Sequence, residues 1–299
     1  MTGDGRPDLH EGADAVPALN EETSTSGAGA GERSVADVGR TALWIALLPT
    51  LWILFGSRLA SFGTDSAHAY WNVWRVGPYT LPPGSPDAYN YTPAFAQVIY
   101  PLTLLPWAAF LAVWSVLLGA ALVWLLWPLT PRWRWLVLAY VAPPALLIGN
   151  IEAFLAVAAV IGLRHPSAWA FPLLTKVTPG LGPVWFGVRR EWRQAAAAVL
   201  GTASVVAVSF AISPQLWQEW WDFIIGAPTP PTQVGYPPLV LRLVLAIVVL
   251  VWGALRGRRG AIAVAMVMAM PLWSSGILVL LTALPRLRSA DVEARRLSG

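Results

Sequence analysis

Long apolar runs alternate with short polar segments along most of this chain. A stretch of about twenty apolar residues can cross a bilayer as a helix. The pattern therefore predicts an all-α polytopic membrane protein, with residues 41–288 as its membrane-embedded domain. The runs are approximately 41–57, 94–127, 135–163, 167–188, 194–212, 239–255 and 261–284.

Prolines and glycines interrupt several of these runs. The run 135–163 contains Pro143-Pro144 and Gly149-Asn150, and the run 167–188 contains Pro172, Pro179 and Pro183. Each run could be one broken span or a hairpin of two short helices. We favour hairpins, because they keep Arg164 on the cytoplasmic side, where basic residues accumulate.

Two other runs are interrupted in a similar way. Pro271 divides 261–284, and basic groups at both of its ends favour a path out and back. Phe95–Leu105 is bounded by Pro93 and Pro106, which indicates a half-helix or an interfacial helix.

Arginine clusters between the runs set the expected topology. Placing them in the cytoplasm puts the loops 58–92 and 213–238 outside and both termini inside. This predicts a plasma-membrane protein with about ten mostly short transmembrane helices and a large first extracytoplasmic loop. The clusters are Arg132 and Arg134; Arg189, Arg190 and Arg193; Arg256, Arg258 and Arg259; and Arg286 and Arg288.

Composition agrees with a membrane protein and narrows the chemistry. The 299 residues are 56% hydrophobic and only 12% charged, against about 25% charged in soluble domains. The basic balance does not indicate nucleic-acid binding, because the arginines lie in small clusters between apolar runs. There is no cysteine, and His10, His68 and His165 have no metal-ligand spacing, so we expect no metal site and no cofactor.

The two ends of the chain are polar. Residues 1–40 are rich in Gly, Ala, Ser and acids, which predicts a disordered cytoplasmic tail. Residues 289–299 form a second cytoplasmic tail.

The first outer loop holds an acid close to the predicted membrane edge. Asp65 could act as a general base on a sugar hydroxyl, or it could cap a short helix that runs through Arg75. His68, one turn further on, could orient a substrate or relay a proton, or be an ordinary surface histidine. Tyr91, with Tyr79 and Tyr89, could pack on a sugar or mark the membrane interface.

Charged residues within the apolar runs are candidate functional residues. Lys176 is the only lysine of the chain, and a charge in such a run favours a functional role, although snorkelling to the interface is an alternative. An ammonium near the membrane surface suits a phosphate. Glu152, beside Asn150, could pair with Lys176 or line a polar cavity.

These features together resemble the polyprenyl-phosphate-mannose-dependent mannosyltransferases of actinobacteria, glycosyltransferase family 87, which have the membrane-embedded GT-C fold. The resemblance covers about residues 41–288 in the family's motif order. Its elements are the early outer Asp65, Tyr91-Thr92-Pro93, Pro101–Pro106, Gly149-Asn150, Lys176-Val177-Thr178-Pro179 and Pro271–Ser275.

The resemblance implies transfer of mannose, with inversion, from a polyprenyl phosphate to a lipid or glycan acceptor outside the membrane. Asp65 would be the base. Lys176, with Arg58 or Arg75, would hold the phosphate. No nucleotide sugar is needed, and membrane lipids would be the other partners.

A non-catalytic membrane protein is the competing class: a degenerate family member, a flippase or other transporter, or an assembly factor. Transporters usually carry internal repeats with broken helices in matching halves, which the chain does not show.

Overall fold

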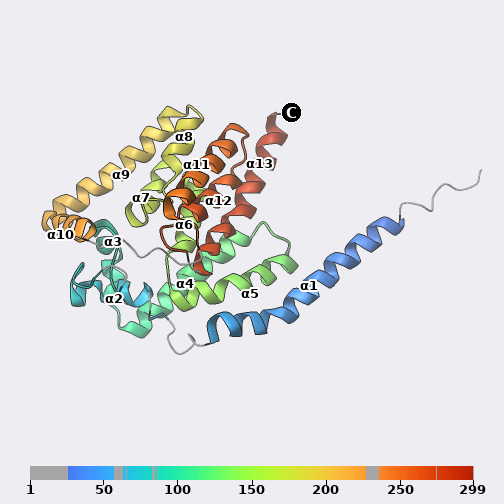
Figure 1. Cartoon of the computed structure of the whole chain (residues 1–299), viewed down its shortest axis with the longest axis horizontal. Coiled ribbons are helices and arrows are strands. Elements are labelled where there is room, and N and C mark those ends of the chain that lie inside the picture. The colour runs from blue at the N-terminus through green and yellow to red at the C-terminus, as the bar shows by residue number, and fades with distance from the viewer. Residues whose placement is uncertain are drawn as a thin grey trace, which may run out of the picture. The chain divides into compact units, whose positions relative to one another are not determined.

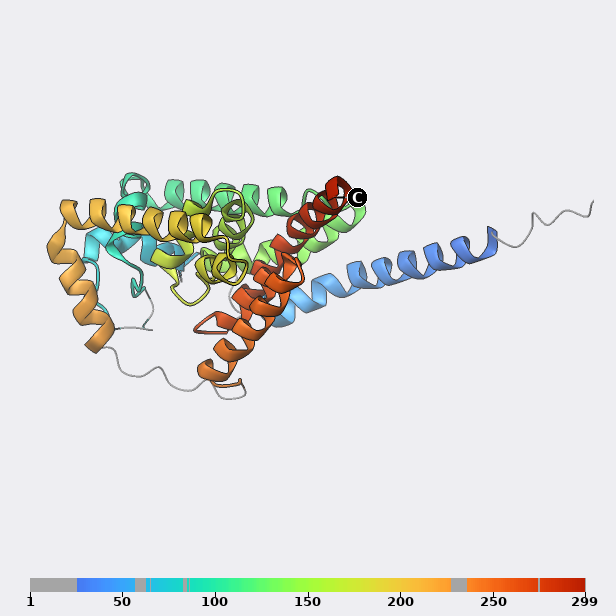
Figure 2. The same cartoon turned by 90° about the horizontal axis from the view of Figure 1, so that it is seen from above.

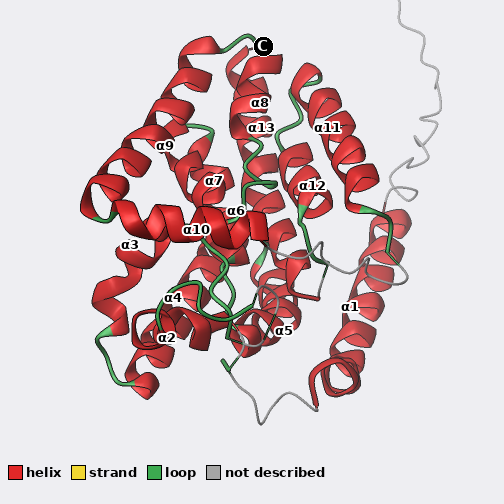
Figure 3. Ribbon diagram, turned by 60° about the vertical axis from the view of Figure 1, so that its left-hand side comes forward, coloured by secondary structure: helices red, strands yellow, loops and turns green. Residues whose placement is uncertain are grey.

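The computed structural model describes residues 26–56, 63–64, 66–82, 85, 87–226, 236–273 and 275–298, and no strand occurs in these ranges (Figures 1 and 3). The helices are α1 (Ser26–Phe55), α2 (Ser66–Val76), α3 (Pro93–Thr103), α4 (Trp107–Leu126), α5 (Pro131–Ile148), α6 (Glu152–Gly162), η2 (Pro166–Trp169), α7 (Ala170–Thr175), α8 (Gly182–Val188), α9 (Trp192–Ile212), α10 (Pro214–Gly226), α11 (Leu239–Leu255), α12 (Gly260–Ala269), η3 (Ser275–Ala283) and α13 (Leu284–Ser298).

Two units make up the chain, residues 1–45 and residues 46–299. The first unit contains the N-terminal part of α1, which begins at Ser26. Residues 26–40 are therefore helical, which corrects the expectation of a disordered tail over the whole of 1–40. No proline lies between Ser26 and Pro49, and Ala, Glu and Arg of this segment favour helix, although its four glycines oppose it. Residues 1–25 lie outside the described ranges.

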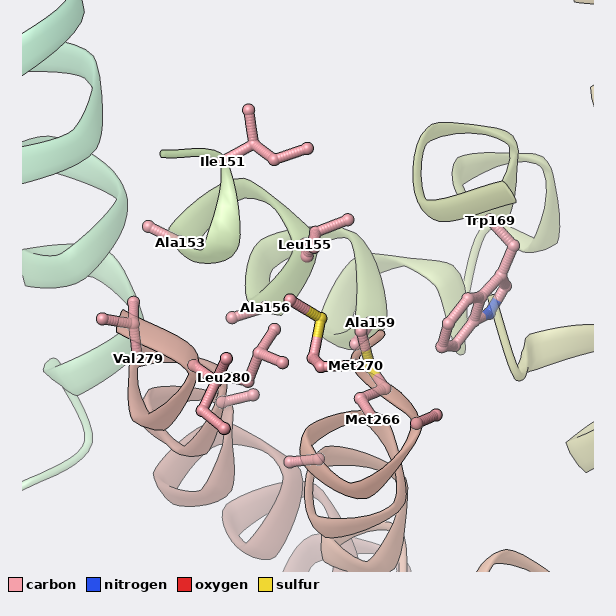
Figure 4. Packing of buried hydrophobic residues seen from close by; sticks show 14 of the residues in the cluster. Ile151, Ala153, Leu155, Ala156, Ala159, Trp169, Met266, Met270, Val279 and Leu280 are labelled. Carbon is pink, nitrogen blue, oxygen red and sulfur yellow. The ribbon is translucent and has the colours of Figure 1, made fainter. Parts of the chain in front are cut away.

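The centre of the second unit is α6. It packs against α4, η2, α7, α12 and η3. Ala156 and Ala159 of α6 lie next to Met266 and Met270 in the buried cluster, to which Leu155 also belongs (Figure 4). A helix that is apolar on all sides is stable only inside other protein or in lipid. Because α6 is short and surrounded by helices, its first residue, Glu152, is held inside the protein.

Two helices are long and apolar enough to cross a membrane, α4 and α9, considering the described residues alone. The pair α5 and α6, bent by 117° at the break between them, would make a third if it counts as one span. The shorter apolar helices α11 and α12 contact each other. This all-helical architecture is that of an integral membrane protein, and the larger number of about ten spans stays a prediction.

The interrupted runs break close to the predicted places. The run 135–163 breaks at Gly149-Asn150, the run 167–188 breaks after Thr175, and the last run breaks after Ala269. Pro143 and Pro144, in contrast, lie inside α5 without ending it. A short α3 lies between Pro93 and Pro106, as predicted.

Side-chain contacts join several basic segments at one end of the second unit. Arg286 Nε donates to the Trp124 carbonyl near the end of α4 at 2.6 Å. Arg189 Nη1 donates to the Ala254 carbonyl near the end of α11 at 3.1 Å. Arg259 and Asp291 form an ion pair at 3.5 Å. On which side of a membrane these segments lie stays a prediction.

Helix α10 follows α9 almost without interruption and turns away from it (Figure 2). Trp217 Nε1 donates to Ser209 Oγ at 3.0 Å, which fixes the corner between the two helices. Phe223 of α10 lies 5.3 Å from the ring of Tyr79. Helix α10 therefore contacts the described part of the first loop.

Candidate functional site

A buried ion pair forms where α6 begins and α7 ends. Lys176 Nζ lies 2.8 Å from Glu152 Oε1, and the two side chains are 14% and 5% exposed. Glu152 is the first residue of α6 and Lys176 is the C-cap of α7. Burial of both charges is tolerable because each satisfies the other. The pairing considered from the sequence is thus present.

Three polar groups meet beside this pair. Tyr70 Oη lies 2.9 Å from both Tyr91 Oη and Asn150 Oδ1, and Tyr91 Oη lies 3.2 Å from Asn150 Oδ1. The backbone N–H of Ile151 also donates to Asn150 Oδ1 at 2.8 Å. Because these donors converge on the amide oxygen, the orientation of the Asn150 side chain is fixed.

The Gly149-Asn150 turn is itself closely packed. Gly149 ends α5 with φ +68°, in the left-handed region that favours glycine. A Cβ atom here would collide with Ala67 of α2. Trp114 Nε1 donates to the Gly149 carbonyl at 2.7 Å. The turn is therefore held between α2 and α4, and this places Asn150 next to Tyr70.

A segment of the first loop, Tyr89 to Thr92, connects this cluster to α7. Thr92 Oγ1 donates to the Leu174 carbonyl at 2.6 Å, close to Lys176. Tyr89 Oη donates to the Thr92 carbonyl at 3.0 Å, and Tyr79 Oη donates to the Tyr91 carbonyl at 2.8 Å. These bonds place Tyr91 between the Asn150 turn and the end of α7.

Four candidates from the sequence are thus brought together: Tyr91, Asn150, Glu152 and Lys176. We call these residues, together with Tyr70, the polar cluster. Tyr70 was not singled out from the sequence, because its apolar neighbours on α2 make it look like an ordinary core aromatic. Burial raises the pKa of the Tyr70 phenol well above its usual value, and Tyr91 raises it further. Tyr70 is therefore a neutral hydrogen-bonding group of the cluster.

The other predicted site residues do not belong to the polar cluster. Arg75 donates to the carbonyls of Trp71 and Thr103, and its guanidinium lies 3.8 Å over the Trp71 ring. It thereby fastens α2 to the C-terminal end of α3. His68 faces Asp87 across 2.9 Å. Asp65 and Arg58 lie outside the described residues.

Arg242 is a buried cation that sequence reasoning missed. It is 4% exposed on α11 and donates to the carbonyls of Pro237, Met270 and Pro271 at 2.6–3.0 Å. Its guanidinium lies 5.1 Å from the centre of the Trp273 ring. The signal that could have found it is the one used for Lys176, a single charge in an apolar run. Here the charge holds the break after α12 in place.

An apolar groove of about 500 Å³ runs along one face of α9. Its α9 side presents residues at intervals of three and four, which is one face of a helix. Leu173 of α7 lines the opposite side, one turn before Lys176. The α9 residues are Val199, Thr202, Ala203, Val206, Ala207 and Phe210. The groove is lined by apolar residues and reaches α7, the helix that ends at Lys176.

No group of three His, Cys, Asp or Glu side chains that could hold a metal ion occurs in the part of the chain that the structure describes. The polar cluster instead offers an ammonium, a carboxylate, an amide and two phenols.

Helices long and apolar enough to cross a membrane, packed with a buried polar cluster, are the architecture of an integral membrane protein. The model of glycosyltransferase family 87 matches residues 89–298, well over half of the chain. The chain therefore belongs to glycosyltransferase family 87, and it is a membrane glycosyltransferase. No curated protein and no solved structure matches the chain.

The matched span divides the predicted site residues. Tyr91, Asn150, Glu152 and Lys176 lie inside it. The four candidates that precede residue 89 lie outside it: Arg58, Asp65, His68 and Arg75.

Proposed function

We propose that the chain transfers a mannosyl unit, or another hexosyl or pentosyl unit, from a polyprenyl phosphate to a lipid or glycan acceptor on the extracytoplasmic side of the plasma membrane. The observation that carries this proposal is the position of Lys176. Lys176 lies beside the other residues of the polar cluster, which could bind a sugar, and one helical turn from Leu173 of the apolar groove. A lipid-linked sugar phosphate has these three parts in the same order.

Lys176 would bind the phosphate through a charge-assisted contact. Glu152 would hold the ammonium in place while the donor is absent. Asn150 and Tyr91 would bind sugar hydroxyls, and the groove on α9 would take the polyprenyl chain. Arg75 is engaged with main-chain carbonyls, so we assign it to the positioning of α3 and leave Arg58 as the second cation for the phosphate.

The transfer needs one base and one leaving group. The acceptor oxygen forms a bond to the anomeric carbon while the bond from that carbon to the phosphate oxygen breaks, with inversion. The electron pair of the broken bond leaves with the polyprenyl phosphate, near Lys176. Asp65 would take the proton of the acceptor hydroxyl. The proposed transfer needs no nucleotide sugar and no cofactor.

Purified protein should transfer label from polyprenyl-phosphate-mannose to one member of a panel of lipid and glycan acceptors. Asp65→Asn keeps the size of the side chain and its capping ability but removes its basicity. We expect this variant to bind donor normally and to lose at least about 10²-fold in rate.

Two outcomes of this assay would count against the proposal. Full activity of Asp65→Asn would remove Asp65 from catalysis and leave it as a helix cap. Failure of the wild-type protein to transfer label from any lipid-linked sugar would contradict the proposed donor class.

A further inference from the structure

His68 and Asp87 come from distant parts of the first loop and face each other. His68 Nδ1 lies 2.9 Å from Asp87 Oδ1, and the side chains are 27% and 30% exposed. Both of these atoms are closed off from solvent, and neither has a hydrogen bond of proper geometry with any described group. The 2.9 Å between the two atoms is within the distance range of a hydrogen bond.

Asp87, which carries this carboxylate, has an unusual backbone conformation. Asp87 has φ +63°, a left-handed conformation that few residues other than glycine adopt, although Asp tolerates it better than most. Ala88 N donates to the Ser85 carbonyl at 3.1 Å on one side, and Tyr89 is buried on the other. Strained conformations persist where the surroundings hold them, and they concentrate at functional sites.

The imidazole of His68 is also held by aromatic rings. Its ring centre lies 5.4 Å from that of Trp71 and 5.0 Å from that of Trp107, the latter edge to face. Trp71 is fixed in turn, because its Nε1 donates to the Leu105 carbonyl at 2.8 Å. The ring is therefore flanked by two indoles, and its Nδ1 faces a carboxylate. These contacts leave the partner of the other ring nitrogen, Nε2, undetermined.

We infer that Asp87 is a positioning residue that holds the Nδ1–H tautomer of His68, so that Nε2 accepts a hydrogen bond from a hydroxyl of the transferred sugar or of the acceptor. This inference rests on the proposed function. A carboxylate that accepts from one ring nitrogen fixes which nitrogen keeps the proton, and the other nitrogen is then available as an acceptor.

The tautomer can be measured without any activity. The chain has three histidines, so ¹⁵N-histidine labelling of the purified protein gives few ring signals. His68→Gln identifies the signals of His68, and His165→Gln is the matched control at a distant histidine. At a pH where the imidazoles are neutral, we expect His68 to carry its proton on Nδ1.

Asp87→Leu should move that proton to Nε2, and Asp87→Asn, which keeps an acceptor oxygen and the size of the side chain, should move it less. Asp87→Asn serves on its own if Asp87→Leu does not fold. Wild-type His68 protonated on Nε2, or a His68 signal unchanged in both Asp87 variants, would overturn the inference.

A second measurement addresses the sugar. In the Asp65→Asn background, polyprenyl-phosphate-mannose or the acceptor identified by the transfer assay should shift the His68 Nε2 signal, and the His165 signals should stay in place. No shift with either compound would overturn the inference even if transfer is observed. Absence of transfer, with the tautomer and the shift as expected, would instead count against the proposed reaction.

Discussion

At the scale of single residues, the ion pair of Lys176 and Glu152 combines a structural role with a proposed binding role. Removing one partner of a buried pair leaves the other charge uncompensated, which typically costs about 3–5 kcal/mol. Two variants therefore separate the roles. Lys176→Met and Glu152→Gln should both lower stability, but only the loss of Lys176 removes the cation.

We predict that Lys176→Met weakens donor binding by at least about 10-fold, which corresponds to about 1.4 kcal/mol. Glu152→Gln should bind donor at least as tightly as the wild type, because the ammonium no longer has a competing carboxylate. Donor affinity measured by titration, with thermal unfolding in the same detergent, provides the comparison. Equal affinity of Lys176→Met and wild type would restrict the lysine to a structural role.

Tyr70 and Tyr89 give a prediction for alkaline pH. Burial raises the pKa of both phenols well above the usual value. Because the folded state favours the neutral phenol, the stabilisation is complete below the usual pKa of about 10 and is lost as the pH rises through the folded value. Tyrosinate absorbance should show late-titrating groups among the seven tyrosines, with one fewer in Tyr70→Phe. Simultaneous ionisation of all seven in the folded protein would contradict this.

At the scale of helices, the turn between α5 and α6 depends on Gly149. Gly149→Ala adds a Cβ atom that meets Ala67 and places a non-glycine residue at φ +68°. We expect a loss of stability greater than about 1 kcal/mol. Gly119 of α4 is the matched control, since a Cβ atom there meets nothing within 4 Å. Gly119→Ala should be neutral or slightly stabilising, and thermal unfolding of the two variants would decide. Equal stability of both would contradict the packing of this turn.

The groove on α9 gives a second prediction at this scale. Ala207→Trp should fill part of the groove, and Val208→Trp, at a neighbouring position that is 62% exposed, is the control. We expect Ala207→Trp to lower affinity for long-chain donors by an amount on the order of 10-fold, with donors of short chain unaffected. Comparable losses in the two variants, or for both chain lengths, would exclude the groove as the site of the polyprenyl chain.

The helices also show how far the sequence could lead. Breaks at Gly149-Asn150 and near Lys176 were predictable, because glycine and proline act through local backbone geometry. Pro143-Pro144 gave a false indication, since both are accommodated inside α5. The approach of Tyr70 to Asn150 depends on how α2 packs against the α5–α6 turn, and no local pattern records that packing.

At the scale of the whole molecule, the arrangement of charges favours one orientation. Contacts of Arg189, Arg259 and Arg286 connect α8 with α11, and α13 with α4 and the start of α12. The ion pair of Lys176 lies at the start of α6 and the end of α7, and the first-loop segment contacts the end of α7 as well. A chain that inserts by the positive-inside rule would place the arginine end in the cytoplasm and the polar cluster outside.

Single cysteines can test this orientation, because the natural chain has none. Thr80 and Gln218 belong to the predicted outer segments, and Thr130 and Ser289 belong to the predicted cytoplasmic ones; all four are exposed. An impermeant thiol reagent added to intact cells should label Thr80→Cys and Gln218→Cys alone. After the cells are opened, Thr130→Cys and Ser289→Cys should react as well, which shows that these two thiols are accessible. Labelling of Ser289→Cys in intact cells would place the C-terminus outside, and the polar cluster would then be on the wrong side for a lipid-linked donor at the extracytoplasmic surface.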